Sequence, residues 1–311
     1  MKNQLSNRSI ISIDDFSKND VKLIFKRADT LKEILKRRGS NLRLRGKVLA
    51  LLFYEPSSRT FASFAAAMQY LGGGLIPLHS MNYSSVAKGE SFEDTIKTFS
   101  HLSDAIVLRS SEKGLAKRAA EISDVPVINA GDGTSEHPTQ ALLDFYTIKN
   151  HFNNISKIKV GLVGDLKNGR TVHSLAKLLL KSGAKNFFWI SPKALKMPAG
   201  IVQQALAHKT QIHETESLTR NISQLDVLYM TRIQKERFVN ITEYQKYKGS
   251  YIVDKNMMEK AKRKMILMHP LPRIGEIGVE VDKDYRAVYF KEQIPNGLYV
   301  RLAILDLILN Q

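Results

Sequence analysis

Short apolar runs of strand length alternate with segments of helical spacing along most of this chain. In the first half the runs lie at residues 48–54, 75–78, 105–108 and 125–128, with helical patterns at 92–102 and 115–122. After a helical stretch at 140–150, further runs lie at 160–163, 187–190, 227–230 and 266–268, with a helical pattern at 171–180. This alternation is typical of βαβ units and predicts parallel sheets covered by helices.

The length of 311 residues favours two α/β domains of similar size, each a doubly wound parallel sheet. We place the first domain at residues 1–138 and the second at 139–292. The C-terminal segment 293–311 is too apolar for a free surface helix, so we expect it to return to the first domain and complete it. At the other end, Ser17 and Asp20 resemble a capping box that begins an amphipathic helix.

Composition excludes several kinds of chemistry. With 43% hydrophobic and 25% charged residues, the chain has the composition of a soluble globular protein. It has no cysteine, which excludes disulfides, thiolate nucleophiles and cysteine-ligated zinc, and the cytoplasm is the expected compartment. Since no stretch reaches the roughly 18 apolar residues of a spanning helix, no membrane partner is expected.

The formal net charge of +17 raises the alternative of a nucleic-acid-binding protein. The densest basic run, residues 32–47, contains no aromatic side chain of the kind that single-strand binders use for base stacking. We therefore interpret this run as a solvated helix face and loop, and predict no nucleic-acid partner.

The first candidate site follows the apolar run 48–54. Ser57-Ser58-Arg59-Thr60 places hydroxyls, unpaired backbone N–H groups and a guanidinium at the start of a predicted helix, an arrangement suited to phosphate. Lys88, in a polar loop with Ser84, adds a mobile point charge, and Arg109 closes a strand at the edge where doubly wound sheets bind ligands. Taken singly, these residues also fit a serine N-cap and solvated basic side chains.

His137 and Gln140 lie at the start of the helix that joins the predicted domains, where we expect a cleft. A lone histidine is more often structural, but one at a helix start in a cleft is a good donor to a developing oxyanion.

In the second half, arginines again follow strands. Arg170 opens a helix after the run 160–163, and Arg232 and Gln234 follow the run 227–230. Guanidinium groups pair bidentately with carboxylates, so the two arginines suit a dicarboxylate, although each also fits a structural ion pair. His269-Pro270-Leu271-Pro272 follows the last run.

Six segments in this order and spacing make the chain similar to the aspartate carbamoyltransferases, a branch of the aspartate/ornithine carbamoyltransferase superfamily. They are residues 55–60, 88–90, 137–144, 169–174, 231–237 and 269–273. Ornithine enzymes share the phosphate half of the site but typically carry cysteine where this chain has Pro270. The pair Arg170 and Arg232 also suits the second carboxylate of aspartate better than the amine of ornithine.

The resemblance implies transfer of the carbamoyl group of carbamoyl phosphate to L-aspartate, an early step of de novo pyrimidine (UMP) biosynthesis, without cofactor or metal. It implies a homotrimer with shared active sites, a first domain for carbamoyl phosphate and a second for aspartate. The implied carbamoyl-phosphate-binding residues are Ser57, Ser58, Arg59, Thr60, Arg109, His137 and Gln140, with Ser84 and Lys88 from a neighbouring chain. The implied aspartate-binding residues are Lys88, Arg170, Arg232, Gln234 and the backbone near Pro270 and Leu271. The implied catalytic set is Arg59, Thr60, Lys88, Arg109 and His137.

The chain departs from the family pattern at four positions. Ser58 keeps the hydroxyl of the usual threonine, and Ala87 replaces a lysine of some members. Ala65 and Gly275 stand where acidic residues are common, which bears on cooperativity more than on chemistry. These last two positions leave a second hypothesis open, a catalytically weak carbamoyltransferase-like scaffold. The resemblance also leaves open a regulatory chain or dihydroorotase as partner.

Overall fold

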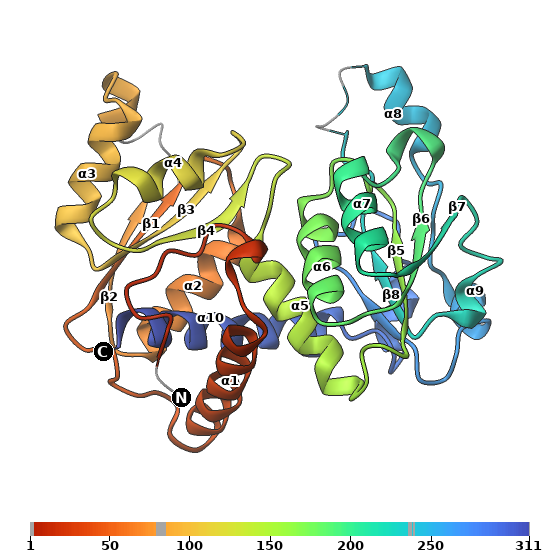
Figure 1. Ribbon diagram of the computed structural model, residues 1–311, viewed down its shortest axis with the longest axis horizontal. Coiled ribbons are helices and arrows are strands. Elements are labelled where there is room, and N and C mark those ends of the chain that lie inside the picture. The colour runs from red at the N-terminus through yellow and green to blue at the C-terminus, as the bar shows by residue number, and fades with distance from the viewer. Residues whose placement is uncertain (1–2, 79–84, 236–237, 239, 311) are drawn as a thin grey trace. The chain divides into compact units, whose positions relative to one another are not determined.

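The structure is a computed structural model that describes residues 3–78, 85–235, 238 and 240–310. The chain divides into two compact units, one formed by Met1–Leu143 with Asn296–Gln311 and the other by Asp144–Pro295. Each unit contains one sheet whose strands are all parallel (Figure 1). The predicted fold class is confirmed, including the return of the C-terminal helix to the first unit.

The first unit has a sheet with the strand order β2-β1-β3-β4. Its strands are β1 (Val48–Phe53), β2 (Gly74–Leu78), β3 (Ala105–Ser110) and β4 (Val127–Asp132). Its helices are α1 (Lys18–Arg38), α2 (Ser58–Tyr70), α3 (Phe92–Leu102) and α4 (Leu115–Ile122). β4 begins two residues later than the apolar run suggested, because Pro126 has no N–H to give to a ladder and serves only as an acceptor, from Ile106 N–H at 2.9 Å.

The capping box predicted at the start of α1 is present. The Ser17 hydroxyl accepts the Asp20 N–H at 3.1 Å, and the Asp20 carboxylate accepts the Ser17 N–H at 2.8 Å. Both ends of the box satisfy backbone N–H groups that a helix start leaves without partners. On the apolar face of α1, Ile24, Ala28 and Leu31 are fully buried.

The C-terminal helix α10 (Ile294–Leu309) is anchored to the first unit by one buried carboxylate. Asp306 is 1% exposed and pairs with Arg27 on α1 and with Arg43 in the segment before β1. Its carboxylate also accepts the Asn310 side-chain amide at 3.1 Å. The Asp306 carboxylate thereby holds α10 against α1 and the segment before β1, which are far from it in the sequence.

The second unit has a sheet with the order β7-β6-β5-β8-β9. Its strands are β5 (Lys159–Val163), β6 (Asn186–Ile190), β7 (Gln211–Thr215), β8 (Val227–Met230) and β9 (Ile266–Met268). The remaining helices are α5 (Pro138–His151), α6 (Arg170–Lys181), α7 (Ala199–Ala207), α8 (Ile241–Tyr247) and α9 (Lys255–Glu259). In the part of the chain that the structure describes, no helix is long and apolar enough to cross a membrane.

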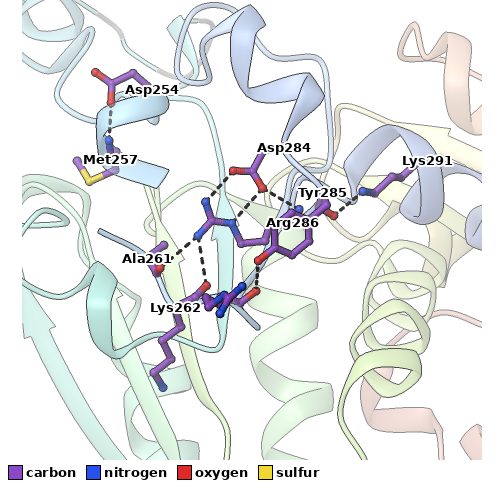
Figure 2. Close-up of polar contacts among 9 residues, drawn as sticks. Asp254, Met257, Ala261, Lys262, Asp284, Tyr285, Arg286 and Lys291 are labelled. Atoms are coloured by element: carbon purple, nitrogen blue, oxygen red, sulfur yellow. Dashed lines mark hydrogen bonds and ion pairs between the residues drawn. The ribbon is translucent and has the colours of Figure 1, made fainter. Parts of the chain in front are cut away.

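An arginine fork ties together two loops of the second unit (Figure 2). Arg286 donates from Nε and Nη2 to the Asp284 carboxylate at 3.0 and 2.7 Å, and from Nη1 to the carbonyls of Ala261 and Lys262 at 3.2 and 3.3 Å. Beside it, the Tyr285 hydroxyl donates to the Arg263 carbonyl at 2.7 Å. The segment 284–286 is therefore fixed to the turn that follows α9.

This fork predicts an acid-sensitive contribution to stability. The hydrogen bond from Arg286 lowers the pKa of Asp284 below the ordinary carboxyl value, so the contribution is present above roughly pH 4 and is lost as the pH falls through the folded-state pKa. We expect Asp284→Asn to lower the free energy of unfolding at pH 7 by about 1 kcal/mol, and the gap to the parent to close below pH 4. Urea unfolding at pH 7 and below pH 4 measures the difference in unfolding free energy between Asp284→Asn and the parent. Asp124→Asn, at an exposed position, is the control. A gap that persists unchanged at low pH would contradict it.

Candidate active site

The predicted phosphate-binding segment 57–60 and Arg109 lie at the topological switch point of the first sheet. In the order β2-β1-β3-β4 the connections diverge between β1 and β3, and open α/β sheets bind ligands outside the carboxyl ends of the strands at such a point. The segment 55–60 leaves β1 there, and Arg109, the penultimate residue of β3, lies opposite Phe53 in the ladder.

The start of α2 offers hydrogen-bond donors at this point. Ser57 is the N-cap residue, and its hydroxyl makes no capping hydrogen bond. The N–H of Phe61 bonds to the Ser57 carbonyl at 3.2 Å, so the N–H groups of Ser58, Arg59 and Thr60 precede that first helical bond. Arg59 is exposed and Thr60 is buried. The helix start thus combines oriented N–H groups, hydroxyls and a guanidinium, which together favour a phosphate.

The Arg109 guanidinium is held in place from both neighbouring strands. It is 9% exposed, with Nη1 donating to the Ala130 carbonyl at 3.0 Å and Nη2 to Glu55 Oε1 at 3.1 Å. Glu55 lies two residues past the end of β1, so the ion pair joins the exits of adjacent strands. Glu55 was assigned no role from the sequence.

The loop that leads to His137 is fixed by two carboxylates. Asp132 accepts the N–H groups of Glu136 at 3.2 Å and of Gly114 at 3.0 Å. Glu136 accepts the Ile13 N–H at 2.8 Å. His137 is 3% exposed and immediately precedes α5, with the half-buried Gln140 in the first turn. His137 therefore lies on a loop that hydrogen bonds hold in place. This loop follows β4, the strand that pairs with β3.

Two predicted phosphate ligands lie elsewhere on the chain. Lys88 is exposed and ends the 3-10 turn Ser85–Lys88, before α3. Ser84 falls outside the residues that the structure describes. We refer to Ser57, Ser58, Arg59, Thr60, Arg109 and His137 below as the first half-site.

The predicted aspartate-binding residues follow the strands at the switch point of the second sheet. In the order β7-β6-β5-β8-β9 this point lies between β5 and β8. Arg170 opens α6 after β5, and the half-buried Arg232 follows β8. The two exits are joined because Thr231 donates from its N–H and its hydroxyl to the Val163 carbonyl, at 2.9 and 2.8 Å.

The close approach of these two strand exits requires glycine at one position. Gly164 has φ +115°, and a Cβ there would lie 2.3 Å from the Thr231 carbonyl oxygen. Past this glycine, the fully buried Asp165 accepts the Asn168 N–H at 2.9 Å. Burial raises the pKa of the Asp165 carboxyl, against the opposing hydrogen bonds from Asn168. These contacts shape the turn that brings Arg170 to the start of α6.

His269 shapes the turn that carries Pro270 and Leu271. Its Nδ1 accepts the Leu271 N–H at 2.7 Å, so the ring proton lies on Nε2, which faces Glu276 Oε1 at 2.7 Å. Burial raises the pKa of Glu276, but the hydrogen bond from His269, the charge interaction with His269 and backbone N–H groups together outweigh burial and leave the pKa below its ordinary value. The His269 N–H donates to Gln293 Oε1 at 3.0 Å. Glu276 and Gln293 were not assigned from the sequence.

Gly275, one of the departures from the family pattern, has φ +104° and no atom within 4 Å of an added Cβ. An aspartate would be accommodated in volume but strained in backbone conformation. Among the described residues, no group of three or more histidine or acidic side chains is placed to hold a metal ion. We refer to Arg170, Arg232, Gln234, Pro270 and Leu271 as the second half-site.

The fold and the placement of these residues define a two-unit α/β protein with arginine side chains at both switch points. Two family models match it. The carbamoyl-P binding domain of aspartate/ornithine carbamoyltransferase matches residues 8–150, and the Asp/Orn binding domain matches residues 156–308. The chain therefore belongs to the aspartate/ornithine carbamoyltransferase family.

Within this family, similar proteins come from the aspartate branch. The chain is 51% identical over 302 residues to the aspartate carbamoyltransferase catalytic subunit of Thermococcus gammatolerans, covering 97% of each chain. A crystal structure of aspartate transcarbamoylase from Trypanosoma cruzi in complex with N-(phosphonacetyl)-L-aspartic acid superimposes with a TM-score of 0.94 at 39% identity, covering 99% of this chain and 97% of the other. The catalytic subunit of M. jannaschii aspartate transcarbamoylase gives a TM-score of 0.88 at 46% identity, covering 96% and 97%.

Proposed function

We propose that this chain transfers the carbamoyl group of carbamoyl phosphate to the amine of L-aspartate, giving N-carbamoyl-L-aspartate and phosphate. The observation that carries the proposal is the placement of guanidinium groups at both switch points, with Arg109 fixed by Glu55 and Ala130. Both substrates are anions, so fixed positive charges offset their mutual repulsion. Relatives at about half identity named as aspartate carbamoyltransferase catalytic subunits support the choice of substrate.

In the first half-site, the start of α2 and Arg59 bind the phosphate of carbamoyl phosphate, while Thr60, Arg109 and His137 polarise its carbonyl. The deprotonated amine of aspartate attacks the carbonyl carbon and forms the new C–N bond. The negative charge that develops on the carbonyl oxygen is met by donors already in place, which is the largest contribution such sites make to rate. The C–O bond to phosphate then breaks, and the leaving phosphate takes the amine proton.

In the second half-site, Arg170, Arg232 and Gln234 bind the carboxylates of aspartate, together with the backbone at Pro270 and Leu271. Guanidinium groups suit carboxylates, whereas the side-chain amine of ornithine would require an acidic partner. The predicted domain limits, 1–138 with 293–311 and 139–292, assign one substrate to each domain.

The test of this function is aspartate-dependent release of phosphate from carbamoyl phosphate. Arg59→Ala should abolish most of this release by removing a phosphate contact, whereas Arg45→Ala, an exposed arginine of the basic run, should leave it unchanged. Equal loss in both variants would point to an effect of net charge. Full activity in Arg59→Ala would exclude the first half-site as proposed.

The His269–Glu276 contact predicts a selective effect on aspartate. Glu276→Gln weakens the hydrogen bond that holds the turn at Pro270 and Leu271, and we expect the KM for aspartate to rise about tenfold, in line with the loss of a hydrogen bond to a charged group. The KM for carbamoyl phosphate should stay within twofold of the parent, roughly the scatter of such contributions. Initial rates, measured with each substrate varied in turn, give both KM values for Glu276→Gln and the parent. A parallel rise in both KM values would contradict a local effect.

We further propose a cytoplasmic homotrimer, acting in pyrimidine biosynthesis, in which Ser84 and Lys88 of one chain enter the site of its neighbour. A regulatory chain or dihydroorotase would be further partners. The support is the position of Lys88, exposed on a short turn and outside the hydrogen-bond network around Arg109.

Shared sites predict complementation between inactive variants. Lys88→Ala and Arg232→Ala should each be nearly inactive alone. If chains are unfolded and reassembled together, about a quarter of the sites should combine an intact Lys88 with an intact Arg232 and recover activity. Rates of the mixture against each variant alone provide the measurement. A mixture as inactive as its components would place Lys88 in the site of its own chain, or outside any site.

A further inference from the structure

A wide helical turn before α10 contacts both ends of the segment that carries Pro270 and Leu271. Residues Tyr289–Gln293 form a π turn, in which the Gln293 N–H donates to the Val288 carbonyl at 3.0 Å. Turns of this kind are rare and are found frequently at functional sites. We refer to Tyr289–Gln293 as the π turn below, and it lies wholly in the second unit.

Gln293 bonds to the first residue of the segment 269–273. The side chain is 3% exposed, and its Oε1 accepts the His269 N–H at 3.0 Å while its Nε2 donates to Asp144 Oδ1 at 2.6 Å. Asp144 is fully buried on α5 and also accepts the Tyr229 hydroxyl at 2.6 Å. These contacts fix the Gln293 amide in one orientation, because the reverse would turn its oxygen towards a carboxylate. The backbone of His269 is therefore held, through Gln293, by a buried carboxylate.

Tyr289 bonds to the last residue of the same segment. Its hydroxyl accepts from Arg273 Nη1 at 3.0 Å and donates to the Asp282 carboxylate. Arg273 Nη2 donates to Asp282 Oδ2 at 2.6 Å, and the guanidinium carbon lies 5.7 Å from the centre of the Tyr289 ring. Two residues of the π turn thus hold the two ends of the segment 269–273.

Between these two ends, the backbone adopts a conformation that is unfavourable for leucine. Leu271 has φ +56°, in the left-handed region that a residue with a Cβ rarely occupies. Such residues persist where the surrounding structure imposes the conformation, and they cluster at binding and catalytic sites. The π turn supplies constraints on both sides of this strained residue.

The π turn is itself held in place by its neighbours. The Val288 N–H donates to the Leu267 carbonyl of β9 at 3.0 Å, and Lys291 Nζ donates to the Tyr285 carbonyl (Figure 2). The fork of Arg286 fixes the residues around Tyr285 in turn. The support for the segment 269–273 is therefore a set of hydrogen-bonded loops within one unit.

We propose that the π turn positions the backbone of Pro270 and Leu271 for aspartate, with Gln293 and Tyr289 as positioning residues that do not touch the substrate. This inference rests on the proposed function, which assigns aspartate to this backbone. Because the segment is ordered before the substrate arrives, binding does not have to supply the cost of ordering it. Loss of the support should weaken the binding of aspartate and spare that of carbamoyl phosphate, which is assigned to the first half-site.

Gln293→Met, which keeps the length of the side chain but loses both hydrogen bonds, tests the proposal in two ways. Hydrogen exchange at the Leu271 N–H should become about tenfold faster, because the segment opens more often. The KM for aspartate should also rise about tenfold, as expected for lost hydrogen bonds that include one to a charged group, while the KM for carbamoyl phosphate stays within about twofold. Tyr289→Phe, a milder change that removes only the hydroxyl, should raise the KM for aspartate about threefold.

Asp226→Asn is the control for a general weakening of the second unit. Asp226 accepts the Lys159 N–H at 2.8 Å and pairs with Lys262, at the amino ends of β5 and β8. This variant should match the parent in both measurements. Equal acceleration of Leu271 exchange in Asp226→Asn and Gln293→Met would overturn the inference, as would an active parent whose KM for aspartate is unchanged in Gln293→Met. If the parent transfers no carbamoyl group, the proposed function fails, and the exchange at Leu271 still decides whether the π turn holds the segment.

Discussion

Replacing Arg109 with methionine should lower the rate of carbamoyl transfer to aspartate about 10²- to 10³-fold, the usual effect of removing one donor that meets a developing oxyanion. Arg109 is buried near the end of β3, and its hydrogen bonds to Ala130 and Glu55 hold the guanidinium in one orientation. The loss should fall on kcat, while the KM for aspartate, bound in the second half-site, should change little. Initial-rate kinetics with both substrates varied provide the measurement.

Glu55→Gln is the matched variant for this effect. It keeps the size of the side chain but removes the charge that pairs with Arg109, so we expect a smaller loss of about tenfold. The exposed Glu112→Gln, on the loop after β3, should be unaffected. Because removal of Arg109 leaves Glu55 without this ion pair, the melting temperature of each variant must be measured as well. A folded Arg109→Met that keeps most of its rate would exclude Arg109 from the reaction.

The largest expected effect on stability comes from Asp306. Asp306→Ala removes a carboxylate that is 1% exposed and pairs with Arg27 and Arg43, leaving both guanidiniums without this partner. We expect the first unit to lose about 2–4 kcal/mol of unfolding free energy, somewhat less than for fully buried partners because both arginines retain access to solvent. Urea unfolding, with limited proteolysis of the C-terminal helix, measures the loss.

Asp306→Asn should lie between the parent and the alanine variant, since an amide keeps one acceptor. Asp124→Ala, at an exposed position of the same unit, should be within 0.5 kcal/mol of the parent, roughly the scatter of surface substitutions. If Asp306→Ala unfolds at the same urea concentration as the parent, α10 is held by apolar packing alone.

Most of the two sheets could be predicted from the sequence because their strands are apolar, including the partly exposed edge strand β2. Eight apolar runs correspond to strands β1–β6, β8 and β9, and the helices at 92–102 and 115–122 have the predicted bounds. β7 was missed because it lies at the edge of its sheet, and its sequence, Gln211–Thr215, is largely polar and exposed. The short helices α8 and α9 carry too few residues for a helical period to stand out.

The placement of charged residues after strand ends could be predicted, because they follow apolar runs and match family motifs. Their contact with substrate stays a prediction. The residues that position them could not be predicted. Glu55 and Arg109 are 54 residues apart, and no local pattern announces their ion pair. The need for Gly164 arises from the approach of Thr231, which depends on the pairing of β5 with β8. Such contacts are set by strand order, which sequence periodicity does not fix.

The most direct test of the account is carbamoyl transfer with L-aspartate and L-ornithine offered in parallel, each with carbamoyl phosphate, and the products identified by chromatography. The account predicts N-carbamoyl-L-aspartate from the parent, loss of that product in Arg109→Met and Arg232→Ala, and no citrulline from ornithine. Citrulline as the main product would contradict the assignment of the second half-site. A folded protein that makes neither product would contradict the proposed carbamoyl transfer.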